Sequence, residues 1–117
     1  MDAYADLWKV VIGYGRNWFI EGKPADAAWA TEFLTVLNAC NAQHGVFFSE
    51  DVYRPFFEYR ERLILIFAKA KEGLAIGPDD IAALTQLSTH GAPGMKSLAG
   101  AMKDDLGSYV RVAIQGS

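Results

Sequence analysis

Hydrophobic residues recur along this chain at spacings of three and four, which is the period of one face of an α-helix. Glycine and proline divide the pattern into five segments, and we expect each of them to be a helix. The expected helices span about Asp2–Glu21, Ala25–Gln43, Ser49–Glu72, Pro78–Thr89 and Pro93–Ile114. The connections between them are short, as is typical of antiparallel neighbours. The pattern therefore predicts an all-α fold, a compact single-domain bundle of four to five helices over residues 1–117.

Two glycines weaken the first expected helix. Gly13 and Gly15 each cost about 1 kcal/mol relative to alanine inside a helix. They either permit a close helix crossing or mark a break in the helix. An alternative reading pairs WKVVI with NWFIE as a β-hairpin that turns at Gly13–Arg16.

The third expected helix has an uncertain start and a strongly apolar second half. Ser49 is a good N-cap, but Pro55 cannot donate a backbone hydrogen bond, so the helix either kinks there or begins near it. Leu63–Ala68 is a run of six consecutive apolar residues. Because successive helical residues advance by about 100°, the run covers every direction around the axis, which predicts burial on all sides. We expect this helix to be central in the bundle. Gly45 and Gly73 are expected to end the second and third helices.

The third helix also carries the surplus of aromatic and charged residues. Seven of the 15 aromatic residues and ten of the 25 charged residues fall between positions 46 and 72. If the second half of the helix is buried, its earlier aromatics cannot all face inward, and some should form an exposed apolar patch. Aromatic and arginine side chains are enriched at binding hot spots. We therefore take Tyr53, Arg54, Phe57 and Arg60 as the candidate partner-binding residues.

Charge and hydropathy exclude several classes of protein. The net charge is −3, and no basic stripe suited to a phosphate backbone is present, so we expect no nucleic-acid partner. Hydrophobic residues make up 51% and charged residues 21%, which is typical of a globular domain. The longest uninterrupted apolar run has six residues, far fewer than a membrane span needs. A single cysteine and an acidic N-terminus without a signal-peptide pattern favour the cytoplasm.

Cys40 and His44 are the strongest candidates for chemistry. They lie four residues apart on the second expected helix and could share one face as half of a metal site or as a nucleophilic pair. Zinc needs three or four protein ligands, and the only other histidine is His90. Cys40 also lies on the apolar stripe, where burial raises a thiol pKa. We therefore expect no metal, cofactor or catalytic residue, and the Cys40/His44 bundle remains an alternative.

The remaining charged residues predict a solvated surface. Glu50 precedes Arg54 by four positions and Glu58 precedes Arg62 by four, the favourable order for exposed ion pairs of about 0.2–0.5 kcal/mol each. These patterns together favour a small helical protein-interaction module, such as an adaptor, an inhibitor or immunity-type binder, or an assembly subunit. A homodimeric structural subunit, with the third helix at the interface, is a second alternative.

Overall fold

Helices make up most of the structure, which is a computed structural model that describes residues 2–91 and 93–105. The elements in chain order are α1 (Asp2–Ile12), η1 (Gly13–Asn17), α2 (Trp18–Ile20), α3 (Ala27–His44), η2 (Gly45–Phe47), α4 (Glu50–Lys71), α5 (Pro78–Thr85) and η3 (Gln86–His90). A further helix covers residues 98–105. Both η1 and η3 are π-helical, and η2 is a 3₁₀ turn. The predicted all-α bundle is confirmed, and the alternative hairpin at residues 8–21 is wrong because those residues are helical.

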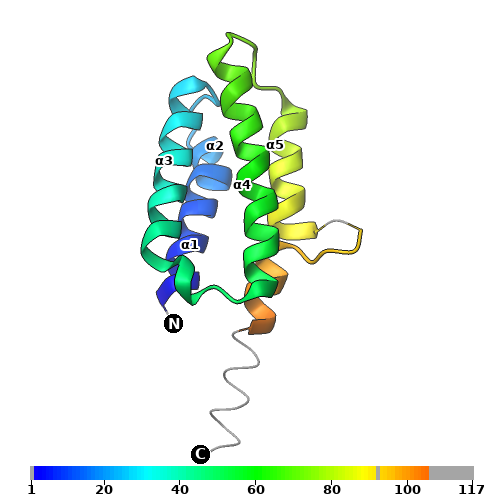
Figure 1. Cartoon of the computed structure of the whole chain (residues 1–117). Coiled ribbons are helices and arrows are strands. Elements are labelled where there is room, and N and C mark those ends of the chain that lie inside the picture. The colour runs from blue at the N-terminus through cyan, green and yellow to red at the C-terminus, as the bar shows by residue number, and fades with distance from the viewer. Residues whose placement is uncertain (1, 92, 106–117) are drawn as a thin grey trace, which may run out of the picture.

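Four helical runs alternate in direction along the bundle (Figure 1). The first run is α1 with η1 and α2, and the fourth is α5 with η3. Neighbouring runs pack in order, α1 on α3, α3 on α4 and α4 on α5, while α5 also contacts η1. The four runs therefore form a ring, in which the last run contacts the first. The largest side chains with almost no exposed surface come from the first three runs and from helix 98–105: Leu7, Trp29, Phe33, Leu37, Phe56, Tyr59, Leu63, Ile66 and Leu98.

The third predicted helix is α4, and it lies between α3 and α5 (Figure 1). The expectation that Leu63–Ala68 is buried on all sides is wrong. Leu63 and Ile66 are buried, but Leu65 is 62% exposed. A helix on the ring of a four-helix bundle has neighbours on its inner side and flanks, so its outer face meets water. The helix also continues through Pro55 without a break.

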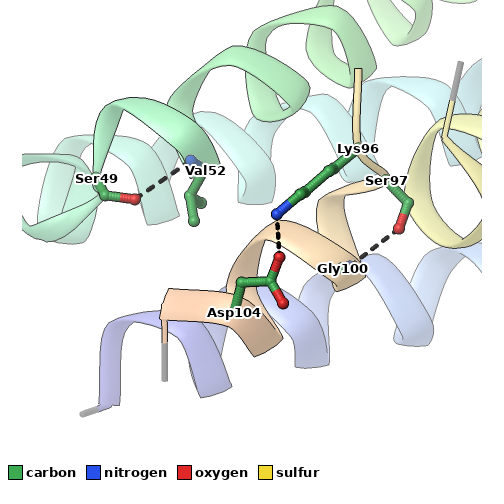
Figure 2. A network of polar contacts seen from close by, with 6 residues as sticks. All are labelled: Ser49, Val52, Lys96, Ser97, Gly100 and Asp104. Carbon is green, nitrogen blue, oxygen red and sulfur yellow. Dashed lines mark hydrogen bonds and ion pairs between the residues drawn. The ribbon is translucent and has the colours of Figure 1, made fainter. Parts of the chain in front are cut away.

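Several predicted helix ends are confirmed. Ser49 caps α4, because its hydroxyl oxygen accepts a hydrogen bond from the N–H of Val52 at 3.3 Å (Figure 2). Gly73 ends α4 in the left-handed conformation, with φ of +83°. The N–H of Leu74 then donates to the carbonyl of Lys69 at 3.1 Å, and the N–H of Gly73 donates to the carbonyl of Ala70. These two bonds form a Schellman motif that satisfies the last carbonyls of the helix.

Gly45 is the C-cap of α3, as the sequence predicts, but it is not in the left-handed conformation. Its φ is −57°, so the backbone stays helical and continues into η2. A Cβ atom there would lie 2.5 Å from the side-chain oxygen of Asn41, so any larger residue requires this side chain to shift.

Gly13 and Gly15 neither break the first run nor bring two helices close together. The run widens into the π-helix η1 and then resumes as α2. A Cβ atom built at either glycine would meet no atom within 4 Å, so no neighbouring backbone needs the missing side chain. The close-crossing interpretation is therefore wrong.

The last predicted helix begins later than expected. Pro93 and Gly94 form a turn, and the helix starts after Ser97, whose hydroxyl oxygen accepts the N–H of Gly100 at 2.9 Å (Figure 2). An ion pair joins Lys96 to Asp104 across this helix. The predicted continuation from 106 to 114 lies outside the described residues. No helix in the described part of the chain is both long and apolar enough to cross a bilayer.

Candidate functional site

Two of the four predicted partner-binding residues hold α3 and α4 together. The hydroxyl of Tyr53 donates to the side-chain oxygen of Asn41 at 3.0 Å. The Nε of Arg60 donates to the side-chain oxygen of Asn38 at 2.6 Å. Asn38 and Asn41 lie one turn apart on α3, so both bonds cross the same helix–helix seam. Tyr53 and Arg60 are therefore structural contacts whose polar groups already have partners.

The other two predicted residues face solvent. Phe57 is 44% exposed, and Arg54 is exposed one turn before it on α4. The Phe57 ring packs on the Tyr53 ring, with 4.5 Å between centroids. The expected ion pairs Glu50–Arg54 and Glu58–Arg62 do not form. The guanidinium of Arg54 is free of any partner among the described residues.

Two further apolar residues, which the sequence pattern does not single out, are exposed between α3 and α4. Val46 is 84% exposed and Phe47 is 55% exposed, both in η2 between α3 and α4. The Tyr53 hydroxyl lies 3.6 Å from the position of a Cβ on Gly45, so the Tyr53 side chain connects η2 with Phe57. We call Val46, Phe47 and Phe57 the corner patch. The signal for Val46 and Phe47 in the sequence is their position between Gly45 at the end of α3 and the N-cap Ser49 of α4.

Cys40 and His44 do not form the pair that the spacing allowed. The Nε2 of His44 lies 2.8 Å from a carboxylate oxygen of Asp6 on α1. Cys40 is buried, and burial, followed by the nearby Asp6 charge, raises its thiol pKa. No hydrogen bond joins the two side chains. Among residues 2–91 and 93–105, no group of three or more histidine, cysteine or carboxylate side chains could hold a metal ion.

A groove of about 440 Å³ lies where the first and last runs close the bundle. One wall comes from α1, η1 and α2, and the other comes from α5 and η3. Trp29 of α3 and Tyr59 of α4, both buried, form its floor. The wall from the last run combines the apolar side chains of Ile81 and Leu84 with hydroxyl side chains at Thr85, Ser88 and Thr89. The groove therefore opens from the surface toward the aromatic core.

Tyr59 is the polar residue at the base of this groove, and sequence reasoning assigned it no role. Its side chain is 1% exposed, and its ring packs edge-on against Phe33. No described residue forms a hydrogen bond with its hydroxyl, yet no fully buried side-chain oxygen of the described residues lacks a partner. Burial raises the pKa of Tyr59 well above its usual 10, so the hydroxyl stays protonated.

Comparison with known proteins adds no identification. No protein-family model, curated protein or solved structure matches this chain. The corner patch and the groove are therefore interpreted from their own geometry.

Proposed function

We propose that this protein is a small helical interaction module that binds a protein partner through the corner patch. The observation that carries the proposal is the exposure of three large apolar side chains, Val46 and Phe47 in η2 and Phe57 two turns into α4. Removing apolar surface from water contributes about 25 cal/mol per Å², so covering these side chains with a partner stabilises the complex. Contiguous exposed apolar surface is a common mark of protein–protein contact.

The rigidity of the corner patch supports the same proposal. The Phe57 ring packs at a tilt against the Tyr53 ring, and Tyr53 is fixed by its bond to Asn41. A side chain that is already ordered loses little conformational entropy when a partner binds. Tyr53 is therefore a positioning residue for Phe57, rather than a contact residue as the sequence suggested.

Arg54 gives the patch a charged edge. It lies one turn from Phe57 and has no ion-pair partner among the described residues. A free guanidinium beside an aromatic ring is typical of interface hot spots and favours a carboxylate on the partner. The proposed partner thus presents apolar side chains next to an acidic group. We further propose a cytoplasmic setting, which rests on the one cysteine of the chain being a free thiol.

Affinity purification from cells that express the protein tests this function. The Val46→Ser/Phe57→Ser double variant should lose the partner recovered with the wild-type chain, while its helical content stays unchanged. Leu65→Ser and Leu74→Ser are matched controls, because these leucines are 62% and 55% exposed but lie outside the corner patch. Retention of the same partner by the double variant would overturn the proposal.

Light scattering separates a foreign partner from a second copy of the chain. If the occupant is a second copy, the wild type should be dimeric and the double variant monomeric. A monomeric wild type at high concentration excludes the homodimer and leaves the heterologous partner.

A further inference from the structure

The groove at the closure of the bundle offers hydrogen-bond donors but no negative charge. Among the described residues that line it, Arg16 on η1 is the only charged one. Arg16 is exposed and forms no ion pair or hydrogen bond with a described residue. Thr85, Ser88 and Thr89 already donate their hydroxyl protons to backbone carbonyls of their own helix. The donors left for a ligand are the Arg16 guanidinium, the Tyr59 hydroxyl and the Trp8 indole N–H, none of which forms a hydrogen bond with a described residue.

The remaining surface of the groove is apolar and aromatic. Val11 and Leu84 lie on its two walls, Phe19 lies near the end of the first run, and the Trp29 ring lies on the floor. The Trp29 indole N–H is already used by the carbonyl of Tyr14 at 3.0 Å, so this ring offers only its apolar face. A volume of about 440 Å³ lies within the roughly 300–1,000 Å³ range of small-molecule sites, which occur between the helices of bundles.

Both π-helical segments of the described chain border this groove. Gly15 and Arg16 belong to η1, and Ser88 and Thr89 belong to η3. A π-helix is rare and is found frequently at functional sites, where it widens the helix and redirects its side chains. Two such segments on opposite walls of one groove are a second observation, independent of the unpartnered donors.

We propose that this groove binds a small apolar monocarboxylate, with its hydrocarbon part against Trp29 and its carboxylate paired with Arg16 and Tyr59. This binding site is separate from the corner patch, and it does not depend on the protein-interaction function. Arginine binds carboxylates through two parallel N–H bonds, and a charge-assisted bond in a half-enclosed groove is stronger than one in open water.

Calorimetric titration with sodium decanoate tests the site. We expect saturable binding of one decanoate per chain to the wild type. Arg16→Gln should weaken binding about tenfold, because it removes a charge-assisted bond, and Tyr59→Phe should weaken it about fivefold. Lys9→Gln is the matched charge control, since Lys9 is exposed on α1 and does not line the groove. Methyl decanoate, which lacks the charge, should bind less tightly than decanoate.

A second pair of variants tests the location by volume rather than by charge. Gly15→Leu should fill the groove and abolish binding, and no atom lies within 4 Å of its new Cβ to oppose folding. Gly13→Leu, on the same π-helix but outside the groove lining, should bind decanoate like the wild type. Absence of saturable binding, or equal binding by wild type, Arg16→Gln and Gly15→Leu, would overturn the proposal.

Discussion

The indole N–H of Trp29 donates a hydrogen bond to the backbone carbonyl of Tyr14, with 3.0 Å between nitrogen and oxygen. This bond joins the buried start of α3 to the π-helix η1. In the same region, the N–H of Trp18 reaches back five residues to the carbonyl of Gly13. The widened turn thus has its carbonyl groups engaged both along the helix and across to α3. Gly15 and Arg16 of this widened turn form part of one wall of the groove.

We predict that Trp29→Phe lowers the free energy of unfolding by about 2–3 kcal/mol. The substitution replaces a fully buried indole with a smaller phenyl ring and leaves the Tyr14 carbonyl without its cross-helix donor. Trp18→Phe is the matched control, because the Trp18 indole also donates to a backbone carbonyl, that of Pro24, but at an exposed site. It should cost about 1 kcal/mol or less. Urea denaturation of both variants measures the two free energies of unfolding. Equal decreases would show that the buried Trp29 contributes no more to stability than the exposed Trp18.

Gly13→Ala should raise the stability of the protein by about 0.5–1 kcal/mol. The residue is helical, and its new Cβ meets no atom within 4 Å, so alanine improves helix propensity at no steric cost. Gly45→Ala should have the opposite sign. It is also helical, but its Cβ would lie 2.5 Å from the Asn41 side-chain oxygen and displace the partner of Tyr53. Thermal unfolding of the two variants measures both signs, and a destabilised Gly13→Ala would mean that η1 requires glycine.

The sequence predicts the local structure of this bundle well, because helix ends are set by nearby residues. Ser49 and Gly73 bound α4, and both act through atoms within five residues of themselves. Pro78 begins α5 as the pattern predicts. The exposure of a side chain is harder to predict, because it depends on how many other helices surround its own helix. Leu65 is apolar like Leu63, and only the packing of the other runs shows that it faces water.

The candidate sites depend on long-range contacts that one sequence does not contain. In the sequence, Tyr53 and Arg60 have the character of hot-spot residues. In the structure, both are hydrogen-bonded to asparagines of α3. The groove requires Tyr59, Arg16 and Ser88 to meet from three separate runs. Of the predicted partner-binding residues, Phe57 and Arg54 are exposed and retain their proposed role.

Two glycines in the turn before helix 98–105 give a test of backbone strain against steric crowding. Gly91 and Gly94 have φ of +82° and +77°, so alanine at either site is strained by about 1–2 kcal/mol. At Gly91 the new Cβ would also lie 2.8 Å from the backbone nitrogen of Ser97, whereas at Gly94 it meets nothing within 4 Å. Gly91→Ala should therefore cost clearly more than Gly94→Ala in chemical denaturation. Equal costs would contradict the close approach at Gly91.

Asp80 should make the stability of the protein depend on pH in the acid range. Its carboxylate oxygen accepts from the ammonium of Lys69 at 2.9 Å and from the N–H of Gly77 at 3.0 Å. The bond from Lys69, followed by the bond from Gly77, holds the pKa of Asp80 below its usual 3.8. A carboxyl group with a lowered pKa in the folded state stabilises the fold above its unfolded-state pKa. That contribution is lost as the pH falls through the folded-state pKa.

The Asp80→Asn variant separates this charge effect from the hydrogen bond at the start of α5, because asparagine can still accept the Gly77 N–H. At pH 7 the variant should be less stable than the wild type by about 0.5–1 kcal/mol, since the Lys69 pair is partly exposed to solvent. The difference should shrink as the pH falls below 3.8 and the wild-type carboxyl becomes protonated. Asp79→Asn, an exposed neighbour in the same first turn, controls for the helix dipole. Urea denaturation from pH 7 to pH 2.5 measures all three proteins, and a constant gap between wild type and Asp80→Asn would show that Asp80 acts without its charge.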